Sequence, residues 1–158
     1  MDDLALARAL HVLAIVHWIG GLAFVTMVVL PSLAKLDGAG RRLAAFEAVE
    51  GRFSAQAKVS VTLAGLTGFY MAHRMDAWER FADPAFWWMA AMAALWAIFS
   101  AVLFVAEPLF LHAWFRRRAA RDEDGTLAFV RRAHVVLLAA ALATVAGAAL
   151  GAHGGGLW

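Results

Sequence analysis

The sequence predicts an all-α integral membrane protein, a four-helix up-and-down bundle that forms one membrane domain over residues 1–158. Hydrophobic residues make up 63% of the chain and charged residues only 16%, with a mean hydropathy of +0.70. A soluble domain is about 45–50% apolar and about 25% charged, and a chain this small cannot hide so much apolar surface in one water-soluble core. The apolar runs do not alternate with a period of two, which excludes the strands of a membrane barrel.

Long stretches without charged side chains mark the membrane spans, because a bilayer core of about 30 Å needs about 20 helical residues. Residues 9–34, 84–106 and 133–158 reach that length directly. The second span is shorter, and it becomes long enough when Lys58 extends its ammonium group toward the headgroups. The predicted helices cover residues 5–33, 53–75, 84–115 and 132–153.

A short helix is predicted before the second span. Over residues 39–50, Leu43, Phe46 and Val49 recur at helical spacing between charged side chains. Such an amphipathic segment is typical of a helix that lies in the membrane interface.

Basic residues gather in two loops, residues 34–58 and 116–132, which together hold eleven of the 14 lysines and arginines. The positive-inside rule places these loops in the cytoplasm and both termini on the extracytoplasmic side. The sequence pI of about 9.7 therefore reflects membrane topology, and a nucleic-acid partner is not predicted. The expected surroundings are a lipid bilayer.

The six histidines carry the candidate chemistry, since the chain has no cysteine to ligate a metal. In the predicted topology, His11, His73 and His153 lie at the outer ends of three different helices. His17 lies about 9 Å deeper than His11, at 1.5 Å per residue. His112 and His134 lie toward the cytoplasmic side. Polar side chains in lipid are costly and tend to line functional interiors.

A haem b in a helix bundle needs one or two imidazoles at matching depth, and small residues that leave room for the ring. We expect His11 as an axial ligand, paired with His73 or His153, with His17 in reserve. Trp18 and Gly21 share a helical stripe with His11 and are candidate cofactor contacts. An alternative pair, His112 and His134, would hold a second haem toward the cytoplasm.

Copper is a competing cofactor. Met71, His73 and Met75 form the pattern M-x-H-x-M, and thioethers with imidazole suit Cu(I). The two methionines share a helical face, whereas the histidine points elsewhere in a regular helix.

Glu107 is the one acidic residue within a predicted span, and it precedes Pro108, which should kink the helix. A salt bridge with Arg131 and Arg132 at the membrane edge would explain it. The functional alternative is a proton-relay group, or a partner that orients His134.

Small residues form one face of the last predicted helix, ending in Gly147 and Gly151. A Gly-x-x-x-Gly face lets another backbone approach closely. It predicts packing within the chain or a homodimer contact.

Two segments carry a resemblance to a known family. The first, LHVLAIVHWIGGLAFVTMVVLP, spans residues 10–31, and the second, GRFSAQAKVSVTLAGLTGFYMA, spans residues 51–72. They resemble the first two helices of the CopD-like family, membrane proteins named for copper resistance, and more distantly the HemJ-type haem b proteins with four helices. The matching residues are His11, Trp18, Gly20, Gly21, Pro31, Arg52, Phe53, Ser54, Thr67 and Gly68.

The resemblance implies a multi-pass protein of the bacterial inner (cytoplasmic) membrane with His11 as an axial ligand. The expected function is therefore haem b binding in electron transfer or haem-linked redox chemistry, as a possible membrane oxidoreductase whose partner is quinone or another redox protein. The alternatives are copper binding or transport of the CopD type, and a cofactor-free accessory membrane subunit.

Overall fold

The computed structural model describes residues 3–36 and 40–152, and within them the chain is helical with no strand. The first long helix runs from α1 (Asp3–Phe24) through a π-helical turn, η1 (Val25–Val29), into α2 (Leu30–Leu33). The second long helix is α3 (Arg41–Arg74). The short 3₁₀ turns η2 (Trp78–Phe81) and η3 (Pro84–Phe86) connect it to the third.

The third long helix consists of α4 (Trp87–Ser100), η4 (Ala101–Leu111) and α5 (His112–Ala119). The segment η4 is a π-helix with Pro108 inside it. Proline lacks an N–H and its ring clashes with the carbonyl four residues earlier, so the backbone widens here. The fourth long helix, α6 (Glu123–Ala152), begins before the predicted boundary at residue 132.

The second helix differs from its prediction. The separate interfacial helix expected over residues 39–50 is the first part of α3, which continues through Gly51 without a break. No proline interrupts this segment, and a single glycine weakens a helix without ending it. The N-terminus of α3 is held by α6, because the Glu123 carboxylate accepts hydrogen bonds from the backbone N–H groups of Gly40 (3.3 Å) and Leu43 (3.2 Å).

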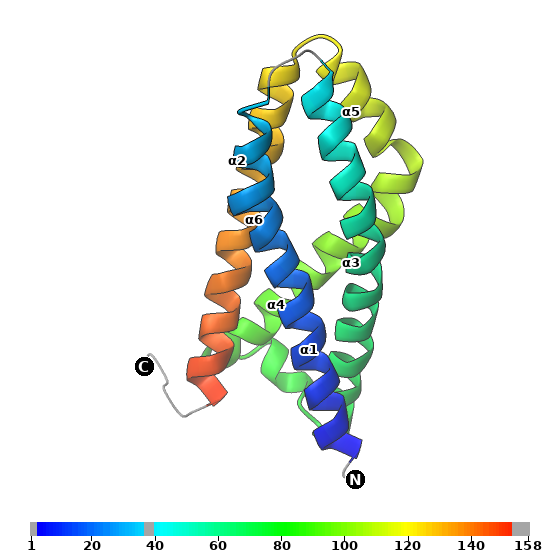
Figure 1. Cartoon of the computed structure of the whole chain (residues 1–158). Helices are drawn as coiled ribbons and strands as arrows, with labels where there is room; N and C mark the ends of the chain where they lie inside the picture. Colours follow the sequence, from blue (N-terminus) through cyan, green and yellow to red (C-terminus); the bar gives the residue numbers. More distant parts are fainter. Residues whose placement is uncertain (1–2, 37–39, 153–158) are drawn as a thin grey trace.

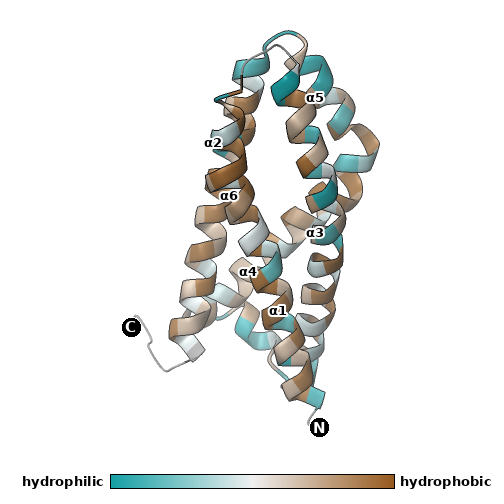
Figure 2. Ribbon diagram, viewed as in Figure 1, coloured by the Kyte–Doolittle hydropathy of each residue, from teal (hydrophilic) through white to brown (hydrophobic). Residues whose placement is uncertain are grey.

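Three helices of the described chain are long and apolar enough to cross a membrane: Asp3–Leu33, Pro84–Ala119 and Glu123–Gly151. Their residues are predominantly hydrophobic (Figure 2), and little of each apolar stretch is buried inside the molecule, which fits contact with a lipid bilayer. The exception is α3, whose buried face carries hydroxyl groups at Ser54, Ser60 and Thr67. It packs along α1 and also touches α4 and η4, so its polar groups face its neighbours.

The helices run up and down. The start of α1 and the end of α6 lie at one end of the molecule, and the connections before α3 and before α6 lie at the other (Figure 1). The core between them is built around Trp18, Leu22, Val61 and Phe99. The end that holds the start of α1 is called the terminal end below, and the opposite end the loop end.

The glycine face of α6 is an internal contact. A Cβ at Gly147 would lie 2.5 Å from Cζ2 of Trp87, and one at Gly151 would lie 2.2 Å from the Trp88 ring. Indole rings of the same chain therefore fill the space beside these glycines. Of the two predictions for this face, packing within the chain is the one that these contacts support.

Candidate functional site

A cavity of about 370 Å³ opens between α1, α3, α4 and α6 toward the terminal end. Its wall is mostly aliphatic and aromatic, with Trp18, Trp96 and Phe99 among the lining side chains. Ligand sites in proteins enclose about 300–1,000 Å³ and combine apolar walls with few polar groups. The cavity thus has the size and character of a site for an organic ligand.

His11 lines this cavity from α1. Its Nδ1 lies 3.0 Å from the carbonyl oxygen of Ala64 and 3.1 Å from the Thr67 hydroxyl, both on α3. A carbonyl oxygen only accepts hydrogen bonds, so Nδ1 carries the proton and Nε2 keeps its lone pair. A backbone carbonyl that fixes the ring through one nitrogen is the arrangement found behind metal-ligating histidines.

Trp18 contributes an unusual polar group to the same wall. The side chain is 5% exposed and its ring packs edge-on against Phe99, with centroids 4.7 Å apart. Its indole Nε1 is buried without a hydrogen-bond partner. By contrast, Nε1 of Trp96 donates to the carbonyl oxygen of Val61 at 2.9 Å. Buried indole N–H groups are normally paired, so Trp18 offers a donor that a bound ligand could satisfy.

Methionine and arginine side chains complete the lining of the cavity. Four methionines contribute thioethers, and two arginines contribute guanidinium groups that suit carboxylates. These residues are Met71, Met75, Met89, Met92, Arg8 and Arg80. His11 is the one histidine among the lining residues in the described part of the chain.

The other predicted ligands of this site lie elsewhere. His73 is exposed and does not line the cavity, although its neighbours Met71 and Met75 do. His17 is also exposed, and its Nδ1 lies 2.8 Å from the Ser60 hydroxyl. His153 lies outside the described residues.

Gly21 belongs to the helix packing. The ring of Phe53 lies against it, with Cε2 only 2.1 Å from the position of a Cβ. Gly21 is therefore a close helix contact and does not line the cavity.

A second polar site lies nearer the loop end, around Glu107 of η4. Its side chain is buried, accepts a hydrogen bond of 2.5 Å from the Ser54 hydroxyl and pairs with Lys58 Nζ at 3.3 Å. The predicted partners were Arg131, Arg132 and His134, on a different helix. His134 instead donates through Nδ1 to the carbonyl oxygen of Val130 in its own helix, at 2.9 Å.

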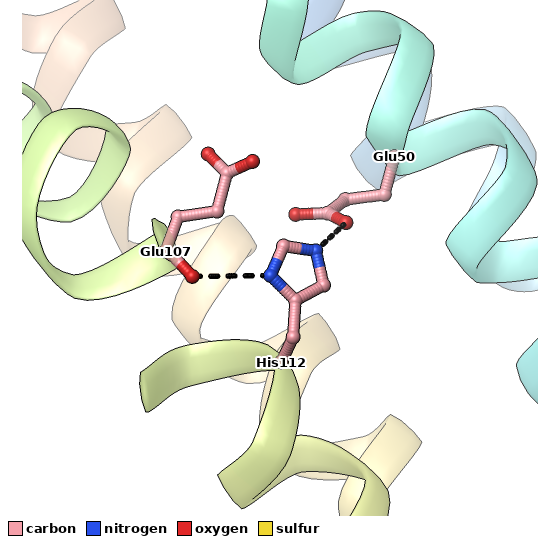
Figure 3. A group of neighbouring side chains, drawn as sticks. All are labelled: Glu50, Glu107 and His112. Carbon is pink, nitrogen blue, oxygen red and sulfur yellow. Dashed lines mark hydrogen bonds and ion pairs between the residues drawn. The ribbon is translucent and has the colours of Figure 1, made fainter. Parts of the chain in front are cut away.

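His112 and Glu50 join Glu107 in this site (Figure 3). Nδ1 of His112 lies 3.1 Å from the backbone oxygen of Glu107, and Nε2 lies 3.8 Å from Oε2 of Glu50. His112 and His134, the pair expected for a second haem, therefore have different partners on different elements.

Sequence reasoning missed Glu50 and assigned no partner to Lys58. A usable signal was present, because Glu50, Ser54 and Lys58 recur every four residues and so share one face of a helix. Dividing the segment into two helices concealed that face.

Burial raises the pKa of the Glu50 carboxyl above its ordinary value of 4.5, and the nearby charge of Glu107 raises it further. A positive charge on His112 and the ammonium group of Lys58 act in the opposite direction and lower this pKa.

The two sites support different chemistry. The cavity at the terminal end can hold an apolar ligand beside one imidazole, whereas the cluster around Glu107 can hold a proton or a cation. No protein-family model, curated protein or solved structure matches the chain.

Proposed function

We propose that this protein binds haem b in the cavity at the terminal end, with His11 as an axial ligand. The observation that carries the proposal is the His11 ring, held through Nδ1 by the Ala64 carbonyl while its Nε2 lone pair remains available in an apolar cavity. Iron in b-type sites is bound by neutral imidazole nitrogen in such surroundings.

The other lining groups support the same ligand. Arg8 and Arg80 could pair with propionate groups, and the buried N–H of Trp18 could donate to a polar edge of the ligand. A cavity methionine replaces His73 in the proposed ligand set, since thioether sulfur is a known partner of histidine on haem iron. Met71, Met89 and Met92 are the half-buried choices.

The bound haem would supply a one-electron carrier. The residues of the chain would keep the imidazole oriented, exclude water by their apolar walls and raise the reduction potential through a thioether ligand. A quinone or another membrane redox protein is the proposed electron partner, which would make the protein part of a membrane oxidoreductase.

An absorption spectrum of the purified protein tests this function. We expect a Soret band, α and β bands that sharpen on reduction, and one haem per chain. His11→Ala should lose most of the haem, while His73→Ala should keep it because His73 is outside the cavity. Full haem occupancy in His11→Ala would overturn the ligand assignment.

Copper is the second candidate, favoured by four methionines and one histidine on the same cavity wall. Soft thioethers and imidazole suit Cu(I). A colourless protein with stoichiometric copper that is lost in Met71→Leu would support copper and exclude haem. If the purified protein binds neither haem nor copper when each is added, the remaining candidate is a cofactor-free accessory subunit.

We further propose that the protein resides in a bacterial inner membrane with the loop end in the cytoplasm. The support is charge: the loop end carries Arg41, Arg42 and the run Arg116–Arg118, and the connection at the terminal end carries Asp76, Glu79 and Asp83. A reporter that is active only in the cytoplasm, fused after residue 158, should stay inactive. An active fusion would reverse the orientation.

A further inference from the structure

We propose that Glu50, Glu107 and His112 form a binding site for a divalent transition-metal ion where α3 meets η4 and α5 (Figure 3). This site is separate from the proposed haem cavity, whose lining contains none of the three residues.

The donor set fits such an ion. One ligand atom from each residue lies within 4.8 Å of the other two. Imidazole nitrogen with carboxylate oxygen is a common ligand combination for zinc, iron(II) and manganese. Two ligands of one zinc ion lie about 3.4 Å apart, from metal–ligand distances near 2.1 Å, so binding requires the carboxylates to move inward by about 1 Å.

The orientation of His112 is the strongest argument. Its Nδ1 must donate to the backbone oxygen of Glu107, because that oxygen only accepts. In the neutral ring Nε2 then carries a lone pair, and it points at Oε2 of Glu50, 3.8 Å away. A proton or a metal ion between these two atoms would satisfy both, and for a metal ion the ring is already oriented by its outer nitrogen.

The charge balance points the same way. Two carboxylates share this cluster, and Lys58 neutralises only one of them through its contact with Glu107. The second carboxylate, on Glu50, faces Nε2 of His112 at 3.8 Å. A bound cation would relieve this excess of negative charge.

An opening beside the cluster provides access. A hollow at the protein surface is lined by Glu107, Pro108, His112 and Arg116, next to the carboxylate and imidazole groups. The π-helical backbone of η4 brings Glu107 and His112, five residues apart, to the same site.

The test is Zn²⁺ binding to the full-length protein in detergent, purified without a histidine tag and dialysed against a chelator. We expect one Zn²⁺ per chain by calorimetry and elemental analysis. Glu50→Gln, Glu107→Gln and His112→Ala should each weaken binding by at least about tenfold, since loss of an outer-shell partner of a ligand already costs about that much. His134→Ala is the matched control, because this side chain lies outside the cluster and should leave the affinity unchanged.

A second variant separates binding from folding. Lys58 occupies Oε1 of Glu107, so Lys58→Met should tighten Zn²⁺ binding several-fold, which a merely structural cluster would not do. Zn²⁺ should also raise the unfolding temperature of the wild type and not that of Glu50→Gln. The His11→Ala variant should keep Zn²⁺ binding, so failure of the haem proposal would not affect this result. Equal Zn²⁺ affinity in the wild type and Glu50→Gln would overturn the site.

Discussion

The imidazole of His11 lies directly over the bare backbone of Gly68, with Cε1 only 3.0 Å from the point where a Cβ would stand. The neighbouring atom Nδ1, 3.4 Å from the same point, is hydrogen-bonded to the Ala64 carbonyl one turn earlier on the same helix. Two features of α3 therefore position the ring. Gly68 has no side chain and leaves room for it, and the Ala64 carbonyl accepts a hydrogen bond from it. Neither partner alone would determine the direction of Nε2.

Substitution of Gly68, which lines the cavity, should disturb the proposed cofactor site through the His11 ring. In Gly68→Val the added carbons would displace the His11 ring, because a contact of 3.0 Å is already tighter than ordinary van der Waals distance. We expect lower haem content and a shifted Soret band in the absorption spectrum. Gly20→Val is the control on α1, where a Cβ meets nothing within 4 Å. Identical spectra for the two variants would contradict the role of Gly68 in positioning the His11 ring.

Trp18 and Trp96 line the same cavity and should respond differently to substitution by phenylalanine. Trp96→Phe removes the hydrogen bond to the Val61 carbonyl and should lower the free energy of unfolding by about 1 kcal/mol. Trp18→Phe removes an N–H group that has no partner in the cofactor-free protein. It should therefore lower the free energy of unfolding by less than Trp96→Phe does.

The measurement is denaturant unfolding in detergent, followed by haem titration of both variants. Trp18→Phe should show the weaker haem affinity of the two if its N–H contacts the ligand. A greater loss of stability in cofactor-free Trp18→Phe than in Trp96→Phe would contradict the unpaired state of this group.

The raised pKa of Glu50 predicts a pH dependence of stability. Between pH 4.5 and its higher folded-state pKa, the folded protein binds more protons than the unfolded chain. Stability should therefore fall as the pH rises through this window and then level off. Glu50→Gln should flatten this part of the curve.

Thermal unfolding from acid to neutral pH, with a chelator present to exclude bound metal, provides the check. The difference between wild type and Glu50→Gln isolates this carboxyl from the other titrating groups. A difference curve that rises with pH would contradict the sign of the shift.

Substitution at Gly147 tests whether the glycine face is internal. A Cβ at this position would lie 2.5 Å from the ring of Trp87, so Gly147→Val should destabilise the fold by about 1–3 kcal/mol, as overpacking does. Ala146→Val is the control on the exposed side of α6. The readouts are the unfolding temperature and the oligomeric state in detergent. A Gly147→Val variant that is stable and changes only its oligomeric state would instead support a homodimer contact through this face.

Composition and hydropathy predicted the helical class and the four long helices, because burial in lipid constrains every residue of a span in the same way. They also singled out His11, Trp18 and Glu107 as polar groups in apolar segments. The bounds of α3 were predicted poorly, since its polar face resembles an interfacial helix when its neighbours are unknown.

Partners across helices were decided only by the tertiary structure. Equal depth suggested His73 as the partner of His11, but the rotation of α3 turns Met71 and Met75 toward the cavity and leaves His73 exposed. In the same packing, Glu107 forms an ion pair with Lys58 of α3, whereas the sequence had suggested arginines of α6.

Sequence by itself thus determined which segments form long apolar helices and roughly how far along the bundle each residue lies, because rise per residue is constant along a helix. Which faces meet depends on how each helix is rotated about its axis. That rotation follows from close contacts such as Gly21 with Phe53 and Gly147 with Trp87, which no local pattern contains.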